Sequence, residues 1–456
     1  MRSPRLIDRF ALAMLPACLG LLACYRTNPN YCPGALHDNC LNVDAAPPPC
    51  SSDQQCTAPL SVCALGGSGP GVCVQCTIME PAACTDKTPV CGADDMCHAC
   101  TAHAQCESNV CLADGSCATE TDVAYVAQGG SGSACSKAAP CATLAQGLQR
   151  TTPYVKLTGL VKDTQTTTIS GKTVTLLADP GAKLDRDGDG PILQVQSTGP
   201  ATSVDIFDLE ITGATGTSGA DGIQLTASGG SPSLNLTRVT IDGNQGNGIS
   251  ASGGTLTATN ATISGNQGNG TSTSGSALTV ARCTISSNTG GGVSITNGTF
   301  TIVGNVFYDN GSDMMPIGGV EISTAQNAMN RLEFNTFYRN KTQDGQGTAI
   351  QCSAGNFTAK NNIMSDNGTL TNAEQVGGSC KHAYSIARPG TLPAGTNNSA
   401  ADPLFVDPAH GNVHIQPTSP ARHAADPTSD LTGIASHDID GDLRVSPADL
   451  GADQVP

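Results

Sequence analysis

The chain has 456 residues and a formal net charge of −16, and its 53 glycines accompany only 3% aromatic and 13% charged residues. The acidic balance argues against nucleic acid as a partner, because phosphates need a basic surface. Low charge with abundant glycine suits a solenoid with polar faces better than a globular α/β enzyme.

The chain begins with arginines followed by an apolar run at residues 10–23, which is too short to span a bilayer comfortably. We therefore expect a signal peptide at residues 1–23. The stretch Leu21-Leu22-Ala23-Cys24 resembles the lipobox of bacterial lipoproteins. The resemblance implies that Cys24 carries a lipid that binds the membrane, and Tyr25 after it implies sorting to the outer membrane. An ordinary secretory signal is the alternative, and the chain is exported either way.

A proline- and asparagine-rich linker at residues 24–49 precedes twelve cysteines within residues 50–118. They form three units of four: Cys50, Cys56, Cys63 and Cys73; Cys76, Cys84, Cys91 and Cys97; Cys100, Cys106, Cys111 and Cys117. The CxxC pairs at the joints between units, taken alone, suggest zinc or a redox dithiol. Repeated spacing in an exported chain favours disulfides instead, because units of about 25 residues cannot fold on apolar burial alone. The spacing leaves the pairing open.

This region resembles the cysteine-rich repeats near the N-termini of lipoproteins from myxobacteria and their relatives, which implies a spacer or a protein-contact module. The composition changes at Thr119. Cys135 and Cys141 then enclose a small loop that we expect a disulfide to close, and residues 140–149 predict a short amphipathic helix. A strand, this segment and a helix in that order resemble the start of pectate-lyase-like β-helix domains, where the helix covers the first coil.

From Leu209 to Asn367 the sequence repeats. One apolar position recurs at intervals of 30, 22, 22, 22, 30 and 27 residues, at Ile211, Ile241, Ile263, Ile285, Phe307, Phe337 and Met364. An asparagine follows three residues after each of these except the first, at Asn244, Asn266, Asn288, Asn310, Asn340 and Asn367. Each unit holds short strands with period-2 alternation, broken by glycine and asparagine.

Such a unit cannot bury its apolar face alone, so neighbouring units must stack. We predict an all-β fold, a right-handed parallel β-helix of about ten coils at residues 119–400 with an N-terminal helical cap. The repeated asparagines would tolerate a left-handed turn and form a ladder between coils about 4.8 Å apart. Tandem loops or a β-sandwich with coincidental spacing are the alternatives.

Three cysteines lie within the coils. The positions two residues before the anchors are also inward, at Leu209, Val239, Ala261, Cys283, Asn305, Asn335 and Asn362. Cys283 thus takes the place of an inward apolar residue, which indicates a buried, inert thiol rather than a nucleophile. Cys352 and Cys380 are 28 residues apart, about one coil. Stacked strands would bring their Cα atoms about 4.8 Å apart, within disulfide range, so we predict this bond.

Polysaccharide lyases with a pectate-lyase-like fold stack acids on one strand face to hold calcium, with an arginine or lysine as base, and related hydrolases use clustered aspartates. The outward residues here are Gln224, Ser250, Ser272, Ser294, Glu321 and Gln351. The acid nearest to Glu321 along the strand face, Asp221, is roughly 19 Å away, whereas a hydrolytic pair needs about 5–9.5 Å. We expect no catalytic residues. If catalysis occurs, the candidates are Glu321 and two loop acids, Asp313 and Asp344.

Two acidic stretches invite a calcium interpretation. Residues 185–190 space three aspartates before glycine, but they lack the far bidentate Glu of an EF-hand, so a solvated turn is the preferred interpretation. Residues 401–456 resemble the closing segment of choice-of-anchor β-helix proteins. There we expect a capping segment that seals the last coil, in which Asp440 and Arg444 pair or tie a terminal turn, and Asp438, Asp440 and Asp442 are the calcium alternative. We predict no cofactor and no metal.

These features predict a lipoprotein of the outer membrane or cell surface, in which a disulfide stalk carries a capped β-helix. Its expected role is non-catalytic: surface structure, adhesion, or recognition of a polysaccharide or a surface protein. The alternative is a polysaccharide lyase or glycoside hydrolase acting near Glu321. Fold analogy alone does not establish a function.

Overall fold

The computed structural model describes residues 48–65, 70–80, 83–186, 188–199, 201–216, 219–325, 327, 329–345, 347–354, 357–368, 374–390, 392 and 396–456. The expected signal peptide and Cys24 lie outside these residues. The chain forms two compact units: the smaller one ends at Cys100 and includes residues 114–116, and the larger one holds residues 101–113 and 117–456. This division differs from the expected boundary at 118/119, because Val110 and Ala118 pack with the first coils, against residues such as Tyr125 and Leu177.

In the smaller unit, disulfides take the place of an apolar core. Its strands are β1 (Pro49–Cys50), β2 (Val62–Ala64), β3 (Gly71–Val74), β4 (Val90–Cys91) and β5 (Cys97–His98), with a 3-10 helix at Asp53–Gln55. In both cysteine units the first cysteine bonds to the third and the second to the fourth: Cys50–Cys63, Cys56–Cys73, Cys76–Cys91 and Cys84–Cys97. The third unit repeats the second-to-fourth bond as Cys106–Cys117, in the larger unit. A first-to-third, second-to-fourth pattern therefore resolves the pairing that the spacing left open.

The larger unit begins with two 3-10 helices, His103–Gln105 and Glu120–Asp122, then β6 (Val123–Ala127) and the one α-helix of the described chain, α1 (Leu144–Leu148). Thr143 caps α1 by accepting a hydrogen bond from the Gln146 backbone at 3.3 Å. Leu144 and Leu148 are buried, and α1 contacts β6, β7 and β9, so the helix covers the first coil as expected. A disulfide joins Cys135 to Cys141 beside it.

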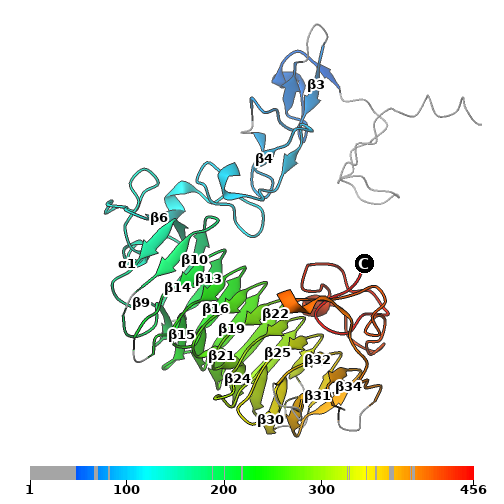
Figure 1. The fold of residues 1–456 in the computed structure, drawn as a ribbon. Helices are drawn as coiled ribbons and strands as arrows, with labels where there is room; N and C mark the ends of the chain where they lie inside the picture. The colour runs from blue at the N-terminus through cyan, green and yellow to red at the C-terminus, as the bar shows by residue number, and fades with distance from the viewer. Residues whose placement is uncertain are drawn as a thin grey trace, which may run out of the picture. The chain divides into compact units, whose positions relative to one another are not determined.

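Three parallel sheets then stack coil upon coil (Figure 1). The first sheet contains β6, β7 (Tyr154–Thr158), β10 (Thr173–Ala178), β13 (Ser203–Phe207), β16 (Ser233–Thr237), β19 (Thr255–Thr259), β22 (Ala277–Ala281), β25 (Thr299–Val303), β28 (Arg331–Glu333), β31 (Thr358–Lys360) and β34 (Lys381–Ala383). The second contains β8 (Leu160–Lys162), β11 (Lys183–Asp185), β14 (Glu210–Thr212), β17 (Thr240–Asp242), β20 (Thr262–Ser264), β23 (Thr284–Ser286), β26 (Val306–Tyr308), β29 (Thr336–Tyr338), β32 (Ile363–Ser365) and β35 (Ile386–Arg388). The third contains β9 (Thr167–Ser170), β12 (Leu193–Ser197), β15 (Ile223–Ala227), β18 (Ile249–Ser252), β21 (Asn269–Ser274), β24 (Gly291–Thr296), β27 (Val320–Ser323), β30 (Ile350–Ala354) and β33 (Val376–Gly378).

The predicted right-handed parallel β-helix is confirmed, and its expected length is corrected. The seven anchor residues of the repeat stand in one register column of the second sheet. Among the described residues the sheets have 11, 10 and 9 strands, so nine successive coils supply all three strands, slightly fewer than the ten expected, and the coils at the two ends are incomplete. Irregular strands at both ends account for the overestimate.

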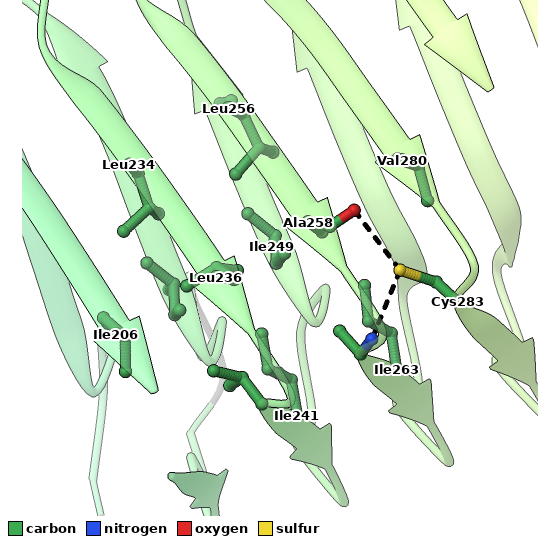
Figure 2. Close-up of a cluster of buried hydrophobic side chains, with 14 of the residues drawn as sticks. Ile206, Leu234, Leu236, Ile241, Ile249, Leu256, Ala258, Ile263, Val280 and Cys283 are labelled. Atoms are coloured by element: carbon green, nitrogen blue, oxygen red, sulfur yellow. Dashed lines mark hydrogen bonds between the residues drawn. The ribbon is translucent and has the colours of Figure 1, made fainter. Parts of the chain in front are cut away.

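The interior of the coils is filled by stacked aliphatic side chains. Figure 2 shows Leu234, Leu236, Ile241, Ile249 and Ile263 pointing into this space from the three sheets, and all five are fully buried. Where the coils become longer, aromatic rings replace the aliphatic column, and the Phe307 and Phe337 rings stack 4.7 Å apart. Close stacking along the whole axis supplies the burial that a single coil lacks.

The asparagine ladder runs through the buried turn after the second sheet. Each side-chain amide donates to the amide oxygen of the next coil, from Asn244 to Asn367, at 2.8–3.0 Å. Gln375 completes the series, since its Oε1 accepts from Asn367 at 2.8 Å. A glycine faces the ladder in the neighbouring strand: a Cβ at Gly270 would lie 2.9 Å from Asn288 Nδ2. The ladder therefore satisfies a continuous row of buried polar groups.

The expected left-handed backbone of the ladder asparagines is wrong. The positive φ angles fall one residue earlier, for example at Gly265 (φ 64°), Ser287 (φ 56°) and Asp309 (φ 53°). The residue before each asparagine makes the tight turn, and the asparagine itself points inward. Asparagine is used here for its two-sided hydrogen bonding rather than for its tolerance of a left-handed conformation.

A second ladder, which the sequence analysis did not predict, lies two residues before the anchors. Asn305 Nδ2 donates to Asn335 Oδ1 at 2.9 Å, and Asn335 donates to Asn362 at 3.1 Å. Cys283 lies one coil before Asn305 in the same column, and its backbone N–H donates to Asn305 Oδ1 at 2.8 Å. Position alone identified these residues as inward, but the hydrogen bonds between coils were missed.

The C-terminal segment, residues 401–456, packs against the side of the coils rather than sealing the last one. It contains β36 (Phe405–Asp407), β37 (Asn412–Ile415), and 3-10 helices at Pro408–His410 and Gly433–Ala435. Its apolar side chains form one cluster with outward residues of the coils, including Val306, Ile363 and Ile386. Three earlier coils, outside this cluster, have threonine in the register column of Val306, at Thr240, Thr262 and Thr284. The outward apolar residues therefore explain where the segment lies.

The last coil contains a buried histidine, and its stability should depend on pH. Burial lowers the pKa of His382 on β34 from 6.5 to about 4. Below pH 6.5 the unfolded chain therefore binds a proton that the folded chain does not, so this contribution to stability is lost as the pH falls from 6.5 toward 4. The expected loss is about 3 kcal/mol. Denaturant unfolding at pH 7 and pH 4 should show a smaller difference for His382→Leu than for wild type. His410→Ala, at an exposed histidine, should behave like wild type; equal pH dependence in all three would contradict this assignment.

Candidate functional site

One outward column of the third sheet corresponds to the strand face examined for catalysis. Gln194 and Gln224 are joined by a hydrogen bond of 2.8 Å, and Ser250, Ser272 and Ser294 follow in register. Glu321 lies between Ser294 and Gln351 in neighbouring strands, and its Oε2 accepts from Ser294 Oγ at 3.4 Å. Among the described residues of this column, Glu321 is the one carboxylate. The column can offer hydrogen bonds to a neutral polymer along several coils.

The loop acids Asp313 and Asp344 lie outside this column. Both are exposed residues of the loops that precede β27 and β30. Asp221 is buried, and its carboxylate accepts from the Asn247 backbone at 2.7 Å and from Asn247 Nδ2 at 3.2 Å. Burial raises the pKa of Asp221, and its hydrogen bonds tie one coil to the next. It is a structural residue.

The loop at residues 185–190 is organised by an arginine. The buried Arg186 guanidinium donates to the carbonyl oxygens of Gly190 at 2.9 Å and Pro191 at 2.7 Å, and also to Asp189. Asp185 forms an ion pair with Lys162 at 3.3 Å. Three backbone carbonyls of this turn are thus bound to the guanidinium.

A pocket lies where the C-terminal segment meets the exposed part of the second sheet, and we call it the C-terminal pocket. Its volume is about 660 Å³. Its wall on the coils includes Arg238, Asn260, Thr262, Arg282 and Thr284, and its wall on the C-terminal segment includes Gly411, His414, His437, Asp440 and Asp453. This pocket gathers more ionisable groups than the column around Glu321.

The two arginines of the pocket are held at equivalent turn positions. Arg238 (φ 54°) and Arg282 (φ 51°) precede an inward residue by one position, in a left-handed conformation. Arg238 forms a two-fold bond with Asp208, at 2.6 and 2.8 Å, which raises the pKa of its guanidinium. Arg282 donates to Asn260 at 3.0 Å and to the Ile434 carbonyl at 3.1 Å. An alignment of the repeats would have shown that both arginines occupy this turn position, three residues before an anchor.

On the opposite wall, three side chains from separate parts of the C-terminal segment converge. One ligand atom from each of His414, Asp440 and Asp453 lies within 4.8 Å of the other two. His414 Nε2 is 2.8 Å from Asp440 Oδ2, and Asp453 Oδ2 accepts from the Ile415 backbone at 2.8 Å. Desolvation raises the pKa of Asp453, and the nearby Asp438 and Asp440 carboxylates add to this shift. A histidine and two carboxylates can hold a metal ion, whereas we predicted none.

Arg444 binds the closing turn rather than Asp440, which is the second of the two roles predicted for these residues. Arg444 is buried, donates to the carbonyls of Gly451 and Ala452, and lies 4.7 Å from the Phe334 ring centroid. Burial lowers the pKa of Arg444 to about 10. Asp438 is also buried, and it accepts backbone hydrogen bonds from Asp440, Asp442 and Gln454. The guanidinium and the Asp438 carboxylate are thus used to satisfy the backbone of the closing turns.

The remaining cysteines of the coils have structural positions. A disulfide joins Cys352 on β30 to Cys380 at the start of the last coil. Cys283 Sγ lies 3.4 Å from both the Ala258 carbonyl and the Ala261 backbone nitrogen (Figure 2). Burial raises the pKa of this thiol to about 12, so it stays protonated near neutral pH and is a poor nucleophile.

Comparison with known proteins places the fold in a class. Residues 221–386 match the family described as right handed beta helix region. The crystal structure of pectate lyase Pel9A is similar, with a TM-score of 0.50 and 15% identity over 73% of this chain and 96% of that chain. No curated protein matches this chain. The larger unit is thus a pectate-lyase-like right-handed β-helix, and at this identity the likeness concerns the fold alone.

Proposed function

We propose that this protein is a lipoprotein of the outer membrane or cell surface whose β-helix recognises a polysaccharide, or a surface protein, without chemical turnover. The observation that carries the proposal is the outward column of the third sheet, in which neutral amides and hydroxyls extend over successive coils around the single carboxylate of Glu321. Such a face suits repeated hydrogen bonds to a polymer. A hydrolytic site needs two carboxylates about 5–9.5 Å apart.

Aromatic rings often serve as platforms for sugar rings, and Tyr308 and Tyr338 lie in register on neighbouring strands of the second sheet. Their rings stack on each other 6.0 Å apart, and the Tyr338 ring meets Phe405 of the C-terminal segment edge-on at 5.5 Å. Both tyrosines belong to the apolar cluster beneath that segment. Packing accounts for these rings, so the proposal rests on hydrogen bonding along the third sheet.

The test is to incubate the full chain with a panel of acidic and neutral polysaccharides, with and without calcium. We expect retention on at least one polymer and no unsaturated or reducing-end products. Retention should fall in the double variant Gln194→Ala/Gln224→Ala, whereas the matched change Thr212→Ala, on the second sheet, should leave it unchanged. Product release that disappears in Glu321→Gln would overturn the proposal and establish the lyase or hydrolase alternative, with Asp313 and Asp344 as the next residues to replace.

The proposed membrane attachment depends on Cys24. Among the described residues, none of the helices is long and apolar enough to cross a membrane. The proposed anchor is a lipid on Cys24, supported by the lipobox-like residues before it. Cys24→Ala is expected to move the protein from the membrane fraction to the soluble fraction and to remove the mass of the lipid. An unmodified wild-type Cys24, or unchanged fractionation of the variant, would count against the anchor.

A further inference from the structure

The C-terminal pocket contains a cluster that the proposed function does not use. His414 lies on β37, Asp440 lies in the turn that follows Asp438, and Asp453 lies three residues before Pro456. One ligand atom from each lies within 4.8 Å of the others. These side chains come from three separate stretches, so the folded segment itself brings them together.

The hydrogen bonds of His414 fix which ring nitrogen carries the proton. Asn412 Oδ1 accepts from the His414 backbone N–H at 3.2 Å, which identifies that atom as the oxygen. The same oxygen lies 2.6 Å from His414 Nδ1, so Nδ1 must be the donor. In a neutral ring, Nε2 then has a lone pair, and it points at the Asp440 carboxylate from 2.8 Å. Two acceptors at this distance require a second proton on the ring or a cation shared between them.

The surroundings favour a cation with more than one charge. The Asp440 and Asp453 carboxylates meet in the cluster, and the Asp438 carboxylate accepts from the backbone of Asp440 and Gln454 beside them. The buried Arg444 guanidinium donates to the carbonyls of Gly451 and Ala452, and its single charge also attracts the Asp438, Asp449 and Asp453 carboxylates. On the facing wall, Arg238 is already paired with Asp208. Bringing carboxylates together raises their electrostatic energy, which a bound metal ion would relieve.

The donor set indicates which metals fit. Calcium and magnesium prefer all-oxygen ligands, whereas an imidazole nitrogen with two carboxylates suits zinc and related transition metals. A histidine whose other ring nitrogen donates to a fixed oxygen is also typical of metal ligands, because that bond orients the ring. Tetrahedral zinc needs its ligands about 3.3–3.6 Å apart. The half-exposed Asp440 side chain can move to close the remaining gap.

We propose that His414, Asp440 and Asp453 bind a divalent transition-metal ion such as Zn²⁺, and that the ion ties the β36–β37 hairpin to the end of the chain. Three protein ligands leave one position of a tetrahedral ion facing the C-terminal pocket, where a ligand from solvent or from a bound molecule completes it. This site shares Asp440 with one calcium interpretation of the sequence, but its other ligands are His414 and Asp453, whereas Asp438 accepts hydrogen bonds from the backbone.

The test is Zn²⁺ titration of the full chain in its oxidised form, after treatment with a chelator, followed by calorimetry. Four proteins are compared: wild type, His414→Ala, Asp440→Asn and the control His410→Ala. His410 forms an exposed pair with Asp407 at 2.9 Å in the same hairpin, so the control removes a histidine–aspartate pair outside the cluster. We expect the two cluster variants to lose one Zn²⁺ equivalent, or to bind it at least about 10-fold more weakly, while the control binds as wild type does.

Thermal unfolding gives the second readout. Zn²⁺ should raise the Tm of the wild type and of the control, because it binds the folded state. The increase in Tm should be smaller or absent in Asp440→Asn. Because Asp440 is partly exposed, this variant should fold normally, and its Tm in the presence of chelator verifies this. Equal Zn²⁺ affinity in all four proteins would overturn the site. Binding of Ca²⁺ as tight as that of Zn²⁺ would overturn the transition-metal assignment.

Discussion

Replacing Asn288 by leucine is expected to lower the free energy of unfolding of the β-helix by about 4 kcal/mol. The buried Asn288 side chain accepts from Asn266 Nδ2 at 2.9 Å and donates to Asn310 Oδ1 at 3.0 Å. It also donates to the Ile263 carbonyl at 2.9 Å and accepts from the Asn266 backbone at 3.2 Å. Leucine has a similar volume but leaves these partners buried and unsatisfied, each at a cost of about 1–3 kcal/mol.

Denaturant unfolding followed by circular dichroism measures this effect. Ser272→Ala, on the outward face of the neighbouring coil, is the control and should change stability by less than about 0.5 kcal/mol. A loss below about 1 kcal/mol for Asn288→Leu would mean that neighbouring coils or water satisfy the freed groups, and the ladder would then be incidental to stability.

Reduction of the disulfides is expected to unfold the smaller unit while the β-helix remains folded. The apolar cluster of the smaller unit consists mainly of cysteines, namely Cys50, Cys63 and Cys73 with Cys56 and Leu60 at its edge. Each of its bonds closes a loop of 13–17 residues and contributes about 3 kcal/mol by the chain-entropy estimate. Without these crosslinks too little apolar surface is buried to offset the chain entropy.

Limited proteolysis with and without a thiol reductant separates the two units. Reduced protein should be cleaved within residues 50–100, while the coils resist. The double variant Cys352→Ala/Cys380→Ala is the matched control, because it removes a disulfide from the solenoid and should leave the protease pattern of residues 50–100 unchanged. Cleavage that starts in the coils, or a smaller unit that resists after full reduction, would contradict the expectation.

The repeat made the solenoid predictable, because a residue that recurs at one coil spacing must occupy one position in the cross-section. Ile241, Ile263 and Ile285 were assigned inward on this ground, and the structure places them in one column. The same reasoning placed Asn305 and Asn335 inward without identifying the ladder they form. Hydrogen-bond direction depends on backbone details that the spacing does not contain, and the left-handed turn was misassigned by one residue for the same reason.

The C-terminal pocket could not be predicted in this way. His414, Asp440 and Asp453 belong to a segment without internal repeats, and their meeting depends on how that segment folds and docks. One signal was available: the outward column of the second sheet that holds threonine at 240, 262 and 284 contains Val306, Ile363 and Ile386 beside Thr336 in the later coils. Apolar residues at outward positions indicate a covered surface. They do not indicate which part of the chain covers it.

The uniform middle coils also have a consequence for the evolution of the molecule. From Asn244 to Asn310 every ladder bond joins residues exactly one 22-residue period apart, and the outgoing donor of one coil is chemically identical to that of the next. Loss or duplication of one such period would juxtapose two asparagines that already fit each other. The solenoid can therefore gain or lose whole periods without leaving a buried polar group unpaired. Its length is a property that gene duplication can change in steps of one coil.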